Sequence, residues 1–137
     1  MNKILILVNI TGLIIGISYG LHGPILPIFA KNVIGASYSE LGLIGLTNFV
    51  PYMFIPLFVG ILLDRINNGY LLAIGAAINS VSIYLLSIAQ SVPEIMGFRI
   101  ITGVAHAFFW PPCQAIIANE STEKNRVRNI SWFTMFF

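Results

Sequence analysis

The chain has 137 residues, of which 57% are hydrophobic and only 9% are charged, and its formal net charge is +2. So few polar side chains do not cover a water-soluble globule of this length, and the composition therefore predicts a protein surrounded by the lipid bilayer. The basic residues are dispersed along the sequence instead of clustered on one face, which argues against a nucleic-acid partner.

The first predicted helix covers about residues 4–30, an apolar run long enough, at about 1.5 Å per residue, to cross a hydrocarbon core of roughly 30 Å. A cleaved signal peptide is the alternative, because Lys3 precedes the run and residues 18–20 resemble a small-residue cleavage site. The run continues well past that site, which favours a retained helix. Pro24 and Pro27 each remove a backbone donor, so we expect the last third of this helix to be kinked or partly unwound.

Four further apolar runs follow, separated by short turns or by the polar loop at residues 119–129. The last run is too short to span a membrane, and it is interpreted as the truncated start of a fifth helix. The predicted fold class is all-α: a polytopic membrane helix bundle in which residues 1–137 form one partial amino-terminal transmembrane domain. Its helices are expected at about residues 4–30, 38–63, 70–89, 92–118 and 130–137.

Two of these helices begin with a serine that is followed three residues later by a glutamate. The pairs are Ser37 with Glu40 and Ser91 with Glu94. This spacing is typical of a capping box, in which the two side chains satisfy backbone N–H groups of the first turn. Glu94 is therefore interpreted as a helix cap in preference to a catalytic acid.

The basic residues outside the helix centres are distributed unequally between the two ends of the predicted helices. Lys31 lies at one end, whereas Lys3, Arg65, Lys124, Arg126 and Arg128 lie at the other. The positive-inside rule therefore predicts a multi-pass protein of the cell membrane whose amino terminus is cytoplasmic.

The second predicted helix ends in a polar motif, with Gly60 separated by three residues from the pair Asp64 and Arg65. From the residues alone, this is an interfacial ion pair with a helix cap. The pattern resembles the signature between the second and third helices of the major facilitator superfamily of secondary transporters. The resemblance implies that Gly60 permits close packing, and that Asp64 and Arg65 form a cytoplasmic latch that changes partners between inward-open and outward-open states.

Arg99 lies about two turns into the fourth predicted helix, where an arginine disfavours membrane insertion by roughly 2.5–3.5 kcal/mol. Steps of four, three and four residues place Arg99, Gly103, His106 and Trp110 on one helical face. This face predicts the wall of a water-filled translocation cavity. The alternative is a structural arginine that pairs with helix carbonyls or extends to the nearby interface.

The pattern of Arg99 followed after three intervening residues by Gly103 is similar to the fourth-helix motif of the same superfamily. The resemblance implies that Arg99 faces the central cavity and takes part in substrate or proton handling, and that Gly103 permits close helix contact. With both motifs on the expected helices, the chain is identified as a member of this superfamily. It corresponds to part of the first six-helix half of a twelve-helix transporter.

The first and fourth predicted helices share a pattern that gives further candidate residues. Each six-helix half of such transporters contains two inverted repeats, so the first and fourth helices correspond, and in both a histidine precedes two prolines. His22 and His106 are therefore candidates for contact with substrate or protons; hydrogen-bonded packing is the alternative. Asn48 and Tyr52, one turn apart on the second helix, add polar contacts to the solute or hydrogen bonds between helices.

The predicted function is a secondary active transporter that moves a small solute, with an anion as one candidate, by alternating access. The remainder of the transporter would lie outside this chain. The alternative is a small membrane assembly or regulatory subunit, or a truncated remnant that does not transport, with a partner subunit covering Arg99. An enzyme is not expected, because His22, His106 and Glu94 are too few and too dispersed for a metal site or a nucleophile with its base. Cys113 is the single cysteine, and the sequence predicts neither a metal nor a cofactor.

Overall fold

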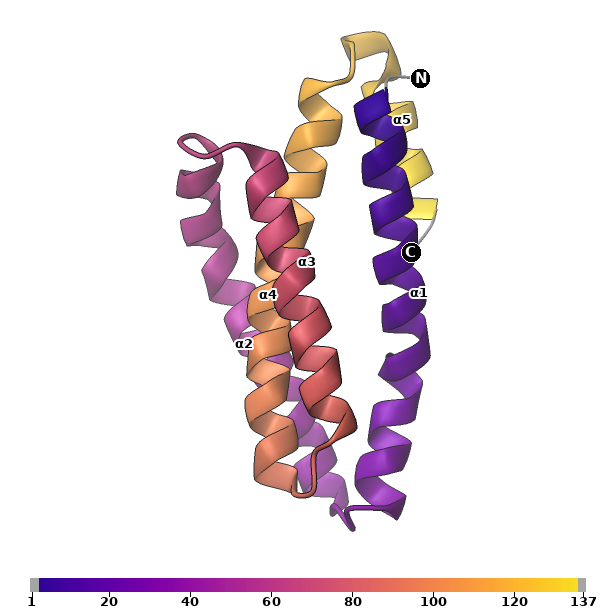
Figure 1. Ribbon diagram of the computed structural model, residues 1–137, viewed down its shortest axis with the longest axis vertical. Helices are drawn as coiled ribbons and strands as arrows, with labels where there is room; N and C mark the ends of the chain where they lie inside the picture. Colours follow the sequence, from indigo (N-terminus) through magenta and orange to yellow (C-terminus); the bar gives the residue numbers. More distant parts are fainter. Residues whose placement is uncertain (1–2, 136–137) are drawn as a thin grey trace.

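The structure is a computed structural model in which residues 3–135 are described, and every secondary-structure element in that range is helical. The elements are connected by short turns and lie side by side along one long axis (Figure 1). α1 to α4 are each long and apolar enough to cross a membrane. The predicted all-α membrane helix bundle is therefore confirmed. The helices are α1 (Lys3–Asn32), α2 (Tyr38–Leu63), α3 (Asn68–Ser87), α4 (Val92–Asn119) and α5 (Glu123–Met135).

α1 continues as a helix through both of its prolines, so the partial unwinding expected there is not found. A proline in a helix removes one hydrogen bond, and its ring crowds the carbonyl of the residue four positions earlier. In α1 those earlier residues are Gly20 for Pro24 and Gly23 for Pro27. Glycine carries no side chain, so the backbone can tilt locally and relieve the crowding.

The predicted start of the fifth helix is wrong, because α5 begins at Glu123 and not at residue 130. Hydropathy marks only the apolar end of this element. The stretch 123–129 is polar, but its Glu, Lys and Arg residues favour helix formation. The Thr122 carbonyl oxygen accepts bonds of 2.9 Å from the N–H groups of Asn125 and Arg126, which closes the first turn. The last two residues of the predicted helix, 136–137, lie outside the described residues.

The first of the two predicted capping boxes is confirmed, and the second forms only in part. The Glu40 N–H donates to the Ser37 hydroxyl at 3.3 Å, and the Ser37 N–H donates to the Glu40 carboxylate at 2.7 Å. Ser91 makes no side-chain capping bond. The Glu94 carboxylate accepts a bond of 2.9 Å from the Gln90 N–H, one residue before the expected donor.

α4 is the central helix and packs closely against both α2 and α3. A Cβ atom at Gly75 of α3 would lie 2.7 Å from the carbonyl carbon of Phe108 in α4, so only glycine permits this approach. The Phe108 carbonyl has no intrahelical donor, because the residue four positions later is Pro112. Gly75 of α3 therefore approaches α4 at the carbonyl that Pro112 leaves without a donor.

Two apolar clusters occupy opposite ends of the bundle. One contains α4 residues from Phe109 to Ile117 together with Leu5 and Val8 of α1 and Phe133 of α5. The other joins Ile95 of α4 to the far ends of α1, α2 and α3. The α4 segment between the clusters contains the buried polar residues described below.

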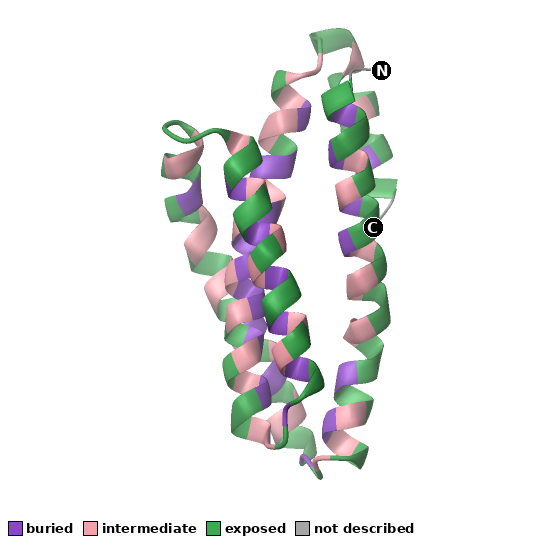
Figure 2. Cartoon of the chain, viewed as in Figure 1, coloured by how far each residue is buried: buried purple, intermediate pink, exposed green. Residues whose placement is uncertain are grey.

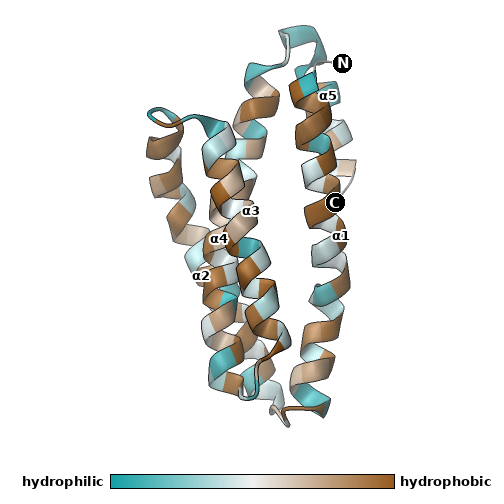
Figure 3. Ribbon diagram, viewed as in Figure 1, coloured by the Kyte–Doolittle hydropathy of each residue, from teal (hydrophilic) through white to brown (hydrophobic). Residues whose placement is uncertain are grey.

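The outer faces of the helices carry many exposed, large apolar side chains (Figures 2 and 3). A water-soluble protein would bury such side chains, whereas a bilayer solvates them. The amino terminus and the α2–α3 and α4–α5 turns lie at one end, and the other two turns lie at the opposite end (Figure 1). Lys3 and Arg65 are therefore at the opposite end from Lys31, as the predicted orientation requires.

Candidate functional site

Six polar or aromatic side chains from three helices gather between the two apolar clusters, and we call this group the polar layer. In it Arg99, His106 and Asn48 are buried, with exposed fractions of 9%, 4% and 1%. Five of the six members were predicted from the sequence. The polar layer consists of Tyr19 and His22 from α1, Asn48 and Tyr52 from α2, and Arg99 and His106 from α4.

Gly103 brings α2 against α4 at the level of the polar layer. A Cβ atom at this position would overlap the Asn48 carbonyl oxygen and would lie 2.6 Å from Cγ of Pro51. The close approach lets the Asn48 side-chain amide donate a hydrogen bond of 3.3 Å to the Arg99 backbone carbonyl. Asn48 therefore forms a hydrogen bond between two helices, which is the second of the two interpretations given for it above.

Tyr19 connects the predicted residues to one another, and the sequence analysis did not select it. Its ring centroid lies 5.1 Å from that of His22 and 4.8 Å from that of His106, edge-on in both cases. Tyr52 contacts His106 from α2 at 6.2 Å. The signal that sequence reasoning missed is the spacing of Tyr19 and His22, which puts them on one face of α1.

The Arg99 guanidinium lies close to the Tyr19 side chain, and its Nε has no hydrogen-bond partner in the described part of the chain. Its exposed fraction is small, so the surrounding helices cover most of the Arg99 side chain. Among residues 3–135 no carboxylate forms an ion pair with it. Arg99 is therefore a buried cation without a carboxylate partner among the described residues.

The two histidines present buried ring nitrogens to the same region. His22 Nδ1 lies 2.7 Å from the Ser18 carbonyl oxygen. Nε2 of His22 and Nε2 of His106 are both buried without a hydrogen-bond partner within residues 3–135. The polar layer therefore offers one cationic donor group and two unpaired imidazole nitrogens.

Trp110 was predicted to share the face of Arg99, but it lies outside the polar layer. Its ring contacts Phe109 at 5.2 Å and Phe133 of α5 at 5.9 Å, both edge-on. Helical spacing alone placed Trp110 with Arg99, and it took no account of α5, which packs against this part of α4. The tryptophan therefore belongs to the apolar cluster near α5.

The predicted latch residues lie away from the polar layer, at the end of α2. Asp64 and Arg65 are exposed there. A Cβ atom at Gly60 would meet no atom within 4 Å, so the described residues provide no packing partner for this glycine. The latch remains a prediction.

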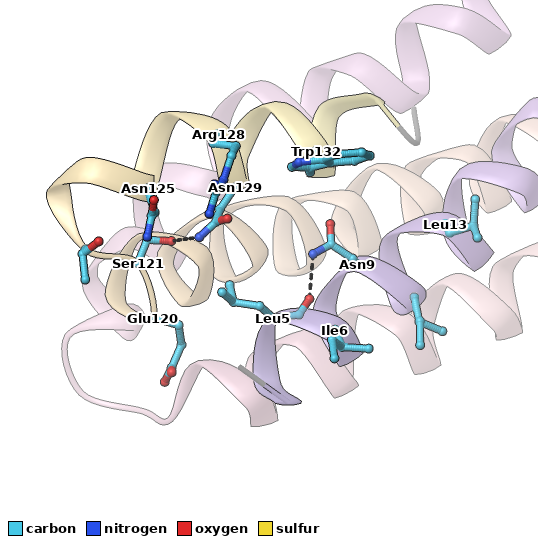
Figure 4. A pocket seen from close by; sticks show the side chains of 12 residues that line it. Leu5, Ile6, Asn9, Leu13, Glu120, Ser121, Asn125, Arg128, Asn129 and Trp132 are labelled. Atoms are coloured by element: carbon cyan, nitrogen blue, oxygen red, sulfur yellow. Dashed lines mark hydrogen bonds between the residues drawn. The ribbon is translucent and has the colours of Figure 1, made fainter. Parts of the chain in front are cut away.

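A larger cavity lies apart from the polar layer, between α1 and α5 (Figure 4). Its volume is about 820 Å³. Asn9 lies on its α1 side, and Arg128, Asn129 and Trp132 lie on its α5 side (Figure 4). A second cavity, of about 400 Å³, lies between α1 and α3 and is lined in part by His22. Within residues 3–135 no three His, Cys, Asp or Glu side chains gather as metal ligands.

The chain is similar to a known family and to curated proteins. The family model described as Major Facilitator Superfamily matches residues 8–137. The quinolone resistance protein NorA of Staphylococcus aureus (strain MRSA252) is 26% identical over 134 residues, which make up 98% of this chain and 34% of that protein. A probable hexose phosphate transport protein of Chlamydia trachomatis is 27% identical over 93 residues, or 68% of this chain and 20% of that protein. The chain thus spans about a third of the length of the first relative.

Proposed function

Because the chain belongs to the major facilitator superfamily, we propose that it is part of a secondary transporter that moves a small solute across the cell membrane by alternating access. Both relatives named above carry transport or resistance names, which supports this assignment. The proposed orientation has the amino terminus in the cytoplasm, in keeping with the basic residues at that end of the bundle. In this orientation Asp64 and Arg65 are on the cytoplasmic side, where the proposed latch would act.

The observation that carries the proposal is the polar layer in the middle of an apolar bundle. A buried polar atom without a partner costs about 1–3 kcal/mol. Three such atoms, Arg99 Nε and Nε2 of both histidines, lie in this one layer. Polar groups in a membrane interior commonly mark a pathway for a solute or ion. We therefore assign substrate or proton handling to Arg99, His22 and His106, with Tyr52 as a further contact.

We further propose that the solute is an anion. Arg99 stays charged at every physiological pH, and a guanidinium binds planar or tetrahedral anions through two parallel hydrogen bonds. The acidic residues of the described chain lie at helix ends and in turns, not in the polar layer. The name of the Chlamydia trachomatis relative also refers to an anionic solute, hexose phosphate. The charge of the polar layer therefore favours an anion over a cation.

Thermal unfolding of the purified full chain tests both parts of the proposal. A solute that binds only the folded protein stabilises it by about 2.7 kcal/mol when present at one hundred times its Kd. We expect anions from a panel of anionic, neutral and cationic solutes of similar size to raise Tm, and we expect Arg99→Gln to remove the effect. Arg126→Gln, which removes an exposed charge on α5, is the matched control and should retain it.

Stabilisation by cationic solutes alone would contradict the proposed substrate class. The alternative function, a membrane assembly or regulatory subunit, predicts that a partner protein raises Tm and that no solute of the panel does so. The same measurement therefore separates the two functions.

A further inference from the structure

His22 has a ring nitrogen that is suited to accept a proton. Its Nδ1 lies 2.7 Å from the Ser18 carbonyl oxygen, which can only accept a hydrogen bond. The neutral ring must therefore carry its proton on Nδ1, and Nε2 has a free lone pair. This Nε2 is buried and has no hydrogen-bond partner in the described chain. The helix backbone thus fixes the tautomer and leaves one defined position for a second proton.

Protonation of His22 would depend on the groups that surround its ring. Tyr19 contacts the rings of both His22 and His106 edge-on, and Arg99 lies in the same polar layer. Tyr52 faces His106 from α2, and α3 contributes Ser87 and apolar side chains beside His22. No carboxylate from the described residues faces the ring. The nearby fixed charge is therefore positive, and it opposes a second positive charge on the imidazole.

A negatively charged solute on Arg99 would change that balance. It would neutralise the guanidinium, and so it would favour protonation of the neighbouring ring. By thermodynamic linkage, protonation would favour binding of the anion by the same factor. We infer that His22 is the proton-binding group of this site and takes up its proton together with an anionic solute held by Arg99. This inference rests on the proposed role of Arg99 in anion binding.

His22 is better placed for this role than His106. His106 lies between the rings of Tyr19 and Tyr52 and is only 4% exposed. His22 is half-buried and borders the cavity of about 400 Å³ between α1 and α3. Tyr19 is a positioning residue, because it contacts both rings and lies close to Arg99.

The proton balance is simple. A proton adds to the Nε2 lone pair and gives an imidazolium with N–H groups at both nitrogens, while Nδ1–H stays bonded to Ser18. The same Nε2 releases the proton when the anion leaves. No other bond is made or broken, and the ring does not need to flip. One positive charge therefore moves with each anion, which lowers the cost of carrying a charged solute through the membrane.

Nitrogen-15 NMR of the imidazole rings tests the inference directly, since the chain contains only two histidines. The full chain would be labelled at histidine and titrated in lipid nanodiscs, with and without benzoate or sulfate as the anionic probe. His22→Gln and His106→Gln assign the two sets of signals. We expect neutral His22 to be the Nδ1–H tautomer. We also expect saturating anion to raise the pH of its half-protonation by about one unit or more.

Arg99→Gln should abolish the effect of the anion on His22, and Arg99→Lys should retain part of it. The inference is overturned if neither probe moves the His22 titration, if the midpoint moves to lower pH, or if only His106 responds. An Nε2–H tautomer for neutral His22 would also overturn it, and this readout needs no variant. A shift of the His22 titration with the anion, without solute flux through the complete transporter, would instead contradict the proposed transport function and leave the inference intact.

Discussion

Replacement of Gly103 by alanine should destabilise the bundle by about 2–4 kcal/mol. The new Cβ would overlap the Asn48 carbonyl oxygen and would lie 2.6 Å from Cγ of Pro51, about 1 Å short of the roughly 3.5 Å at which carbon atoms pack. Relief requires α2 to move away from α4, and such overpacking costs about 1–3 kcal/mol. A shift of that size would also break the Asn48–Arg99 hydrogen bond of 3.3 Å, which adds about 1 kcal/mol.

Gly97→Ala provides the matched control on the same helix. A Cβ at Gly97 meets no atom within 4 Å, and alanine is favoured over glycine in a helix by about 0.8–1 kcal/mol. We therefore expect this variant to be as stable as the parent or slightly more stable. The assay is equilibrium unfolding of the purified protein in mixed detergent micelles, followed by tryptophan fluorescence. Equal stability of Gly103→Ala and Gly97→Ala would refute the close contact between α2 and α4.

Three further predictions concern topology, capping and the contact between α3 and α4. In a Cys113→Ser background, a cysteine placed at Gln90 should react with an impermeant maleimide added to intact cells, whereas a cysteine placed at Thr122 should not. The reverse labelling would contradict the orientation. Ser37→Ala should cost about 1 kcal/mol in unfolding, because it removes a capping bond, whereas Ser91→Ala should change stability by less than about 0.5 kcal/mol. Similar losses of stability in Ser37→Ala and Ser91→Ala would show that the caps are assigned wrongly. Gly75→Ala should cost about 1–3 kcal/mol, because its Cβ would lie 2.7 Å from a backbone carbonyl carbon of α4, and a neutral effect in the same unfolding assay would contradict that contact.

Sequence reasoning succeeded where hydropathy and turn chemistry dominate. The four spans and the capping box at Ser37 follow from apolar runs and side-chain spacing, which are local properties. The start of α5 does not follow from them, because its first two turns are polar and form a helix from intrinsic preference. Hydropathy therefore detected the part of α5 that suits lipid and missed the part that does not.

The polar layer was predicted for a different reason: ionisable and amide groups in an apolar run need a partner or a function. Arg99 and His106 were therefore visible in the sequence. Tyr19 was not, because a tyrosine in a membrane helix is ordinary, and its importance comes from contacts across to α4. Gly60 and Gly103 were both selected by their motifs, and of these two Gly103 makes the close contact; the contact at Gly75 was not predicted, because it depends on the partner helix.

The most direct test of the account compares Arg99→Lys with Arg99→Gln in the complete transporter to which this chain is proposed to belong, with uptake of the anion that raises Tm and membrane abundance measured on the same preparation. If Arg99 binds an anion through two parallel hydrogen bonds, lysine keeps the charge but loses the paired geometry, and uptake should fall substantially at normal abundance. Glutamine should abolish uptake without reducing the folded amount, because it removes a cost of insertion. Normal uptake per folded molecule in Arg99→Gln, or loss of the folded protein in Arg99→Gln with full activity in Arg99→Lys, would contradict the account.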